Sequence, residues 1–106
     1  MSAGRESARR ESARAEIVVE GRVQGVGFRD FARRAAERIG LVGYVMNLAD
    51  GTVRVVVEGE RAVVEALVPE LEQGPRLGKV THVSVTWMAP RGEFTRFGIE
   101  YSERGA

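Results

Sequence analysis

The sequence contains no cysteine, a single histidine and few aromatic residues, and each shortage narrows its chemistry. Without cysteine the chain has no disulfide, no thiolate nucleophile and no cysteine metal site, which suits a reducing compartment. Its 16 basic and 15 acidic residues nearly cancel, so no bulk attraction to nucleic acid or to an anionic membrane is indicated. The sequence also lacks an apolar run of the ~20 residues that a membrane span needs, and the apolar core of a secretory signal. We therefore expect a cytoplasmic protein.

The length of the chain and the composition of its first residues predict one folded domain preceded by a tail. The 106 residues suffice for a single domain with a single core. Residues 5–9 and 10–14 repeat the sequence Arg-Glu-Ser-Ala-Arg, and no large apolar residue follows Met1 in this stretch. Such a segment has no apolar face to bury. We expect a disordered tail over residues 1–15 and a folded domain over residues 16–104.

The spacing of apolar residues predicts an α+β domain. Helices are predicted at residues 30–39 and 60–72, although Pro69 should kink the second helix or end it early. Strands are predicted from β-branched or alternating runs at residues 17–20, 41–46, 52–57, 79–87 and 97–101. This order indicates an antiparallel sheet with two helices on one face, extended by a short C-terminal strand. The order of the strands within the sheet cannot be read from periodicity.

A glycine-rich segment lies between the first predicted strand and the first predicted helix. Gly25 and Gly27 allow positive φ angles, and the following helix supplies free N–H groups, so a small dianion such as phosphate would fit there. Arg29, at the first turn of that helix, could clamp two phosphate oxygens. The same pattern also suits a simple tight turn with a surface arginine. A dinucleotide fingerprint is excluded because position 30 is Asp, and a P-loop signature is absent.

Two segments resemble motifs of the acylphosphatase family. They are GRVQGVGFR at residues 21–29 and GYVMNLADGTV at residues 43–53. The resemblance extends over residues 16–101 and implies a ferredoxin-like β-α-β-β-α-β fold. It departs from the family pattern at Tyr44, where tryptophan is common, and at Met46, where arginine is common. These two changes bear on strand packing and substrate preference near the site.

The resemblance also implies a function and its residues. The expected reaction is hydrolysis of an acyl phosphate to a carboxylate and inorganic phosphate, which is both product and inhibitor. Arg29 would bind the phosphate and Asn47 would position the attacking water. The backbone of the loop would form the phosphate cradle through Gln24, Gly25, Val26, Gly27 and Phe28. No metal, cofactor, covalent intermediate, nucleic acid or membrane is implied, and we expect a monomer.

This chemistry needs few groups. The leaving group is a stabilised carboxylate, so the protein must mainly neutralise phosphoryl charge and align a water. The amide of Asn47 can accept a hydrogen bond from that water but cannot act as a strong base. Arg29 can supply the positive charge, and no cluster of Asp or Glu has metal-ligand spacing.

The sequence leaves two other functions open, RNA binding and non-catalytic phosphate binding. Residues 24–31 partly resemble an RNA-recognition signature, but Val26 stands where a stacking aromatic is needed and Gln24 where a cation is needed. A non-catalytic phosphate-binding module is a second alternative, since similar domains also begin larger hydrogenase-maturation carbamoyltransferases. We expect His82 to be an ordinary sheet residue. We also expect packing roles for Trp87 and Phe97, and a solvated helix face from Arg33, Arg34 and Arg38.

Overall fold

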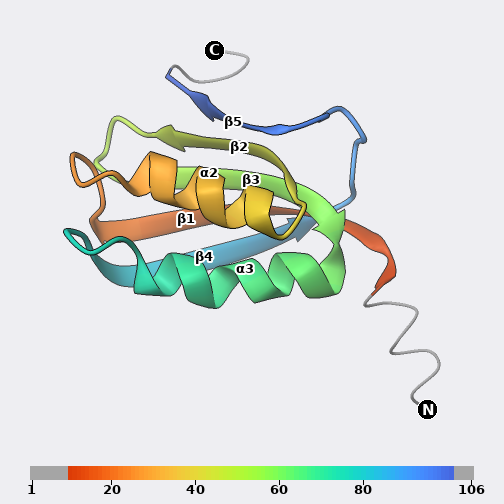
Figure 1. Ribbon diagram of the computed structural model, residues 1–106, viewed down its shortest axis with the longest axis horizontal. Helices are drawn as coiled ribbons and strands as arrows, with labels where there is room; N and C mark the ends of the chain where they lie inside the picture. The colour runs from red at the N-terminus through yellow and green to blue at the C-terminus, as the bar shows by residue number, and fades with distance from the viewer. Residues whose placement is uncertain (1–9, 102–106) are drawn as a thin grey trace.

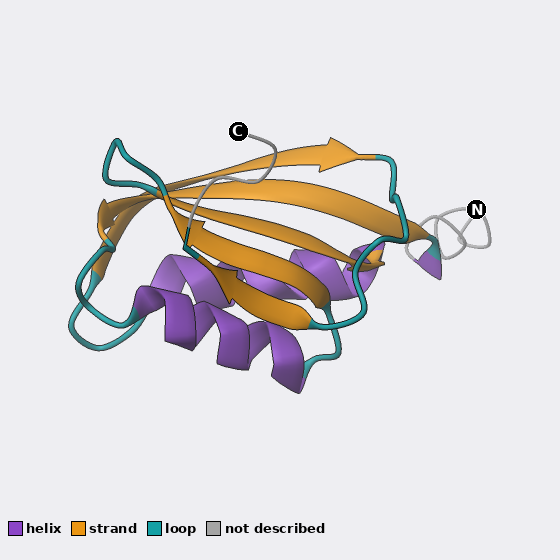
Figure 2. Cartoon of the chain, turned by 90° about the horizontal axis from the view of Figure 1, so that it is seen from above, coloured by secondary structure: helices purple, strands orange, loops and turns teal. Residues whose placement is uncertain are grey.

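Two helices cross one face of a five-stranded sheet in the computed structural model, which describes residues 10–101 (Figures 1 and 2). The strands are β1 (Ser12–Arg22), β2 (Val42–Asn47), β3 (Val53–Glu60), β4 (Lys79–Met88) and β5 (Phe97–Glu100). The helices are α2 (Phe28–Arg38) and α3 (Arg61–Gln73). The element order is the one that the sequence predicts. Within residues 10–101, neither helix is long and apolar enough to cross a membrane.

The sheet has the strand order β4-β1-β3-β2-β5. β3 lies at the centre and pairs antiparallel with β1 and β2, and β1 also pairs antiparallel with β4. β5 is the exception, because it pairs in parallel with β2 and forms the edge of the sheet. The predicted ferredoxin-like arrangement is therefore confirmed, with one parallel edge strand added to the antiparallel sheet. Because β1 continues into the loop before α2, the sequence 23–27 lies at one end of this sheet.

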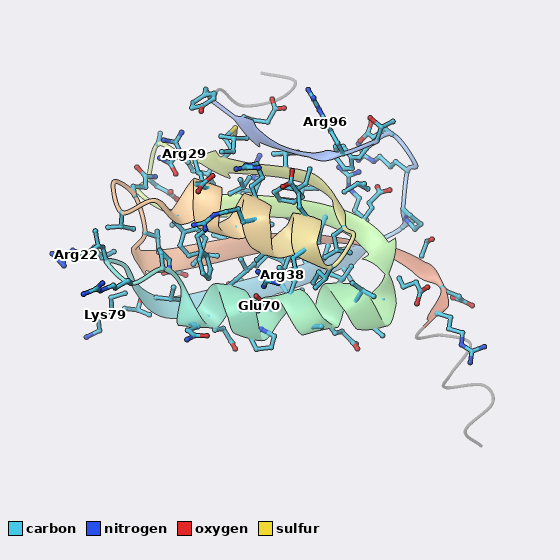
Figure 3. All side chains as sticks on the ribbon, in the orientation of Figure 1. Arg22, Arg29, Arg38, Glu70, Lys79 and Arg96 are labelled. Carbon is cyan, nitrogen blue, oxygen red and sulfur yellow. The ribbon has the colours of Figure 1, made fainter. Side chains whose placement is uncertain are left out.

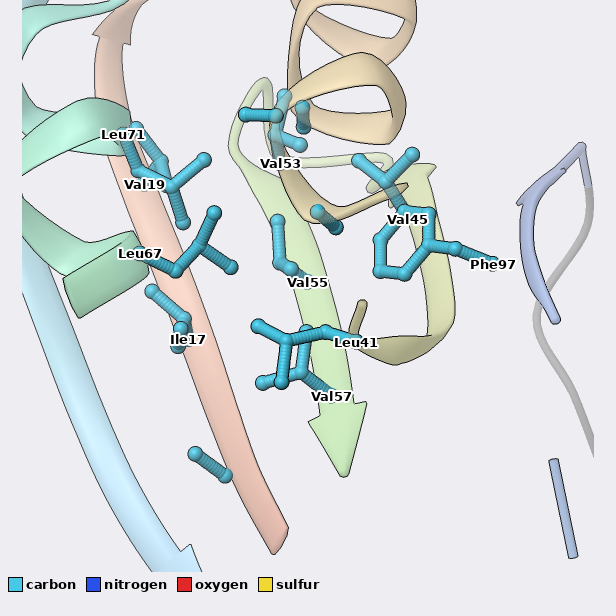
Figure 4. Packing of buried hydrophobic residues seen from close by; sticks show 14 of the residues in the cluster. Ile17, Val19, Leu41, Val45, Val53, Val55, Val57, Leu67, Leu71 and Phe97 are labelled. Carbon is cyan, nitrogen blue, oxygen red and sulfur yellow. The ribbon is translucent and has the colours of Figure 1, made fainter. Parts of the chain in front are cut away.

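The core lies between the sheet and the helices, where strand residues alternate into it (Figure 4). Ile17 and Val19 of β1 are fully buried and lie opposite Val55 and Val53 of β3. Leu67 of α3 is also completely buried. Burying each such side chain contributes about 1.5–3 kcal/mol. The core thus anchors β1 and β3, and these strands carry the loops of the candidate site.

One glycine of the second motif is required by close backbone packing. Gly43 in β2 has φ 143°, and a Cβ placed there would lie 1.9 Å from the carbonyl oxygen of Val56. Any other residue would push β2 away from β3. This contact fixes the strand that ends in Asn47.

The predicted boundary of the tail is wrong by several residues. β1 begins at Ser12, and Ala13, Arg14 and Ala15 are buried. Small alanines suffice on the core side of β1, and Arg14 faces the other side, where it pairs with Glu58. The alternation of Ala13 and Ala15 with Ile17 and Val19 is the signal that shows the longer strand. Residues 1–9 and 102–104 of the predicted tail and domain lie outside the described residues.

The early end of the helix predicted at Pro69 is also wrong, because α3 continues through it to Gln73. Pro69 is exposed, so its ring meets solvent rather than the core. Val64, Leu67 and Leu71 are buried on both sides of it, and their packing holds the two halves of the helix against the sheet. Tertiary burial therefore outweighs the ~3 kcal/mol that an interior proline costs an isolated helix.

Candidate active site

The loop between β1 and α2 turns through two glycines in left-handed conformations. Gly25 has φ 75° and Gly27 has φ 81°, angles that other residues adopt at a cost in strain. A Cβ built at either position meets no atom within 4 Å, so both glycines border open space. Gly27 is the N-cap of α2 and supplies no side-chain cap. The loop therefore leaves the N-terminus of α2 accessible to a ligand that binds in this open space.

The N–H groups at this helix start lack partners within residues 10–101. The first intrahelical bond is donated by the N–H of Phe31 to the carbonyl of Gly27, at 3.0 Å. Among the described residues, no backbone or side-chain acceptor takes the N–H groups from Gly25 to Asp30. Unpartnered N–H groups and the positive end of the helix dipole favour an anion.

Arg29 projects from the first turn of α2, at the end of the sheet that also carries Arg22 and Lys79 (Figure 3). Its guanidinium lies 5.0 Å from the centre of the Tyr101 ring. No acidic group among residues 10–101 forms an ion pair with it. Its positive charge therefore remains available to a ligand.

The neighbouring carboxylate of Asp30 is held by other cations. Asp30 accepts a hydrogen bond from Arg33 at 2.6 Å and forms an ion pair with Arg34 at 3.0 Å. The hydrogen bond from Arg33, assisted by the charge of Arg34, holds the pKa of Asp30 below its ordinary value. Asp30 thus lines the site without neutralising Arg29.

Asn47 is the last residue of β2, and strand alternation from the buried Val45 places it on the helix-facing side of the sheet. Its Oδ1 atom is buried and has no hydrogen-bond partner among the described residues. A buried amide oxygen without a partner is unusual, because leaving it unmet costs about 1–3 kcal/mol. This oxygen is an acceptor ready for a water molecule or a ligand.

Gln24 fixes the glycine loop to the hairpin that follows Asn47. Its Nε2 donates to the carbonyl oxygens of Leu48 and Thr52, each at 2.8 Å. The hairpin itself is closed by the N–H of Leu48, which donates to the carbonyl of Thr52 at 2.9 Å. These bonds set the position of Asn47 relative to the loop, although the two lie far apart in the sequence.

These groups border one hollow of about 220 Å³. Its lining is made by Val23, Gly25, Gly27, Phe28, Arg29, Asp30, Asn47, Ile99 and Tyr101. The structure therefore brings together five of the seven predicted site residues. The other two, Gln24 and Val26, do not line it, and the side chain of Phe28 belongs to the core. Sequence reasoning missed Ile99 and Tyr101; only the parallel pairing of β5 with β2 brings them here.

The other residues considered in the sequence lie away from this hollow. His82 is exposed on β4, opposite Glu20 of β1. Phe97 is buried, and Trp87 packs against the core with Arg61 4.0 Å above its ring. Arg33, Arg34 and Arg38 form ion pairs on the helix surface, the last with Glu70. Within residues 10–101, no three ligating side chains gather closely enough to hold a metal ion.

The chain resembles known proteins over nearly all of the described residues. A family model for acylphosphatase matches residues 15–99. An acylphosphatase of Anaeromyxobacter dehalogenans is 47% identical over 86% of this chain and 98% of its own length. One of Thermococcus kodakarensis is 51% identical over 74% of this chain and 87% of its own length. The crystal structure of acylphosphatase from Bacillus subtilis matches with a TM-score of 0.81 at 38% identity, covering 84% of this chain and 99% of that one.

Proposed function

This chain belongs to the acylphosphatase family, and we propose that the hollow at the start of α2 is the active site in which it hydrolyses acyl phosphates. In this proposal Arg29 and the loop N–H groups bind the phosphoryl group, and Asn47 positions the attacking water. We retain the expectation of a cytoplasmic monomer that needs no metal, nucleic acid or membrane.

The convergence of three unmet polar features on one hollow supports this assignment. They are the N–H groups of the loop, the charge of Arg29 and the Oδ1 atom of Asn47, none of which has a partner among residues 10–101. A phosphoryl dianion satisfies the first two, since its oxygens accept from N–H groups and from the planar fork of Arg29. A water bound to the phosphoryl group's far side satisfies the third.

The reaction then proceeds in one displacement at phosphorus. Asn47 Oδ1 accepts a hydrogen bond from the water and orients its lone pair toward the phosphorus atom. As the new P–O bond forms, the bond between phosphorus and the acyl oxygen breaks, and its electron pair leaves with the carboxylate. A phosphoryl oxygen takes the proton of the water. Arg29 and the N–H groups stabilise the charge on the equatorial oxygens, so the protein acts by positioning and electrostatics.

The hydrogen bonds of Gln24 fix the distance between the loop before α2 and the β2–β3 hairpin. The nucleophile is positioned from the β2–β3 hairpin and the phosphoryl group from the loop before α2. Because Gln24 joins both segments through two hydrogen bonds, the amide of Asn47 and the phosphoryl-binding loop are held at a fixed separation before substrate arrives.

A turnover assay with purified protein tests the proposal. We expect hydrolysis of acetyl, benzoyl and carbamoyl phosphate, with competitive inhibition by inorganic phosphate and no response to chelators. Absence of turnover together with saturable phosphate binding would favour the alternative of a non-catalytic phosphate-binding module.

The Asn47→Ala variant tests the division of roles. It should bind inorganic phosphate with nearly the wild-type affinity and lose about 10²–10³-fold in kcat, because only the orientation of the water is lost. An equal loss of phosphate affinity and turnover would instead mean that Asn47 has a structural role. Asn47→Asp keeps the size and adds a negative charge, so it should weaken phosphate binding as well.

A further inference from the structure

The hollow has an apolar side that phosphate binding and water activation do not use. Ile99 of β5 and Tyr101, the residue after that strand's Glu100, line it together with the glycines, Arg29 and Asn47. Ile99 packs against the core from the edge of the sheet. The hollow of about 220 Å³ is larger than a phosphoryl group alone, so it has space for part of the acyl group.

Tyr101 is an exposed aromatic residue at the mouth of this hollow. It is 78% exposed, one of the few large apolar side chains among residues 10–101 that are not covered. Its ring lies against the guanidinium of Arg29, with 5.0 Å between the guanidinium carbon and the ring centre. A cation stacked on an aromatic face keeps its in-plane N–H donors free. Tyr101 can therefore contact Arg29 without competing with phosphate.

The geometry of displacement determines which side the acyl group occupies. The attacking water and the leaving oxygen lie on opposite sides of phosphorus. In the proposed reaction the water lies against the Oδ1 atom of Asn47, which is buried. The leaving carboxylate must therefore point outward, toward the exposed Tyr101.

We propose that Ile99 and Tyr101 form an acyl-binding wall that makes this enzyme prefer acyl phosphates with a flat, apolar acyl group over those with a small one. An aromatic acyl group lying on this wall buries apolar area and contacts the Tyr101 ring. The inference rests on the proposed function, since it assigns the acyl half of the substrate to the same site.

The ratio of kcat/KM for benzoyl phosphate to kcat/KM for acetyl phosphate measures this preference. In the Tyr101→Ala variant the ratio should fall about five- to tenfold, the size of a lost aromatic contact. Tyr101→Phe keeps the ring and should keep the wild-type ratio. Met88→Ala removes another exposed side chain, at the opposite end of the sheet, and serves as the matched control with an unchanged ratio.

Inorganic phosphate separates this role from an effect through Arg29. It has no acyl group, so its inhibition constant should change much less than the benzoyl phosphate kcat/KM in Tyr101→Ala. If both substrates and phosphate weaken by the same factor, Tyr101 acts only on Arg29 and the acyl wall is wrong. An unchanged ratio also overturns the wall. Failure of the wild type to hydrolyse either substrate would overturn the proposed function itself, a different result from these two.

Discussion

Arg14 and Arg29 belong to opposite ends of the same sheet and have opposite surroundings. Arg14, near the start of β1, is 7% exposed and donates to Glu58 at 2.8 Å and to Glu93 at 3.1 Å. Arg29, after the end of β1, forms no ion pair with any acidic group of residues 10–101. Each arginine also lies near an aromatic ring, Phe94 for Arg14 and Tyr101 for Arg29. The two arginines therefore differ in whether carboxylates pair with them: Arg14 has two such partners, and Arg29 has none among residues 10–101.

The carboxylates around Arg14 hold the chain between β4 and β5. Glu58 accepts the N–H groups of Arg91 at 2.9 Å and Gly92 at 3.0 Å in addition to Arg14. Burial favours the neutral acid, but these N–H groups and the Arg14 guanidinium outweigh it and lower the pKa of Glu58. Burial likewise opposes the charge of Arg14, and the hydrogen bonds of Glu58 and Glu93 outweigh it, so its pKa is raised.

This contrast separates a structural cation from a binding one. A buried guanidinium paired with protein carboxylates already has its counter-charge, and breaking this pair leaves a buried charge. A guanidinium without carboxylates contributes little to folding and keeps its donors for an incoming anion. Loss of the Arg14 interactions should therefore lower the free energy of unfolding, whereas loss of Arg29 should lower turnover.

The largest expected effect is on turnover in Arg29→Ala. Loss of the phosphate clamp should lower kcat/KM about a thousandfold or more, while the free energy of unfolding changes by less than about 0.5 kcal/mol. Benzoyl phosphate kinetics and urea denaturation measure the two quantities. Arg29→Lys keeps the charge without the planar fork and should recover only part of the rate. Near-normal turnover in Arg29→Ala would refute the assignment of Arg29.

The next largest effect is on stability in Glu58→Gln. The amide keeps the size but leaves the buried Arg14 without its main counter-charge, so the free energy of unfolding should fall by about 3 kcal/mol. Turnover should stay within about threefold of wild type, because the hollow lies at the other end of the sheet. Glu70→Gln is the matched control, since its ion pair with Arg38 is far more exposed than the Arg14–Glu58 pair and should contribute less than about 1 kcal/mol. Equal losses in the two variants would mean that the buried pair is not a structural anchor.

The Arg29 side of this comparison could be predicted from the sequence, because its signals are local. Gly25, Gly27 and Arg29 lie within five residues, and the strand and helix around them have clear apolar periods. Asn47 could be added only through the resemblance of the second motif, since no local pattern distinguishes it from a turn asparagine.

The Arg14 side could not be predicted, because its partners are distant in sequence. Glu58 is separated from Arg14 by 44 positions and Glu93 by 79. Without these partners, Arg14 looks like part of a polar repeat, and the sequence therefore predicts residues 12–15 to be part of the tail. Tyr101 is a similar case: its contact with Arg29 depends on the parallel addition of β5 to β2, and pairing between strands leaves no trace in apolar periodicity.

A smaller effect is expected at Gln24, which joins the binding side to the hairpin of Asn47. Gln24→Glu keeps the size but has no N–H to donate to the carbonyls of Leu48 and Thr52. We expect a loss of about 2 kcal/mol in the free energy of unfolding and a fall in kcat that exceeds the change in phosphate affinity. Gln73→Glu, at the exposed end of α3, is the control. If kcat is unaffected, the bridge does not set the position of the water.

The smallest expected effect is on the pH dependence of the free energy of unfolding at acid pH, to which Glu58 contributes. Its pKa is lower in the folded protein than its ordinary value of 4.5, so the folded state favours the carboxylate. This stability is present above pH ~4.5 and is lost as the pH falls through the folded-state pKa, with a slope of at most ~1.4 kcal/mol per pH unit for one group. Urea denaturation at pH 6, 4.5 and 3.5 should show a shallower acid loss in Glu58→Gln than in wild type. Parallel curves would place the acid sensitivity elsewhere, with the exposed Asp30 and Asp50, whose pKa values are also lowered, as the next carboxylates to replace.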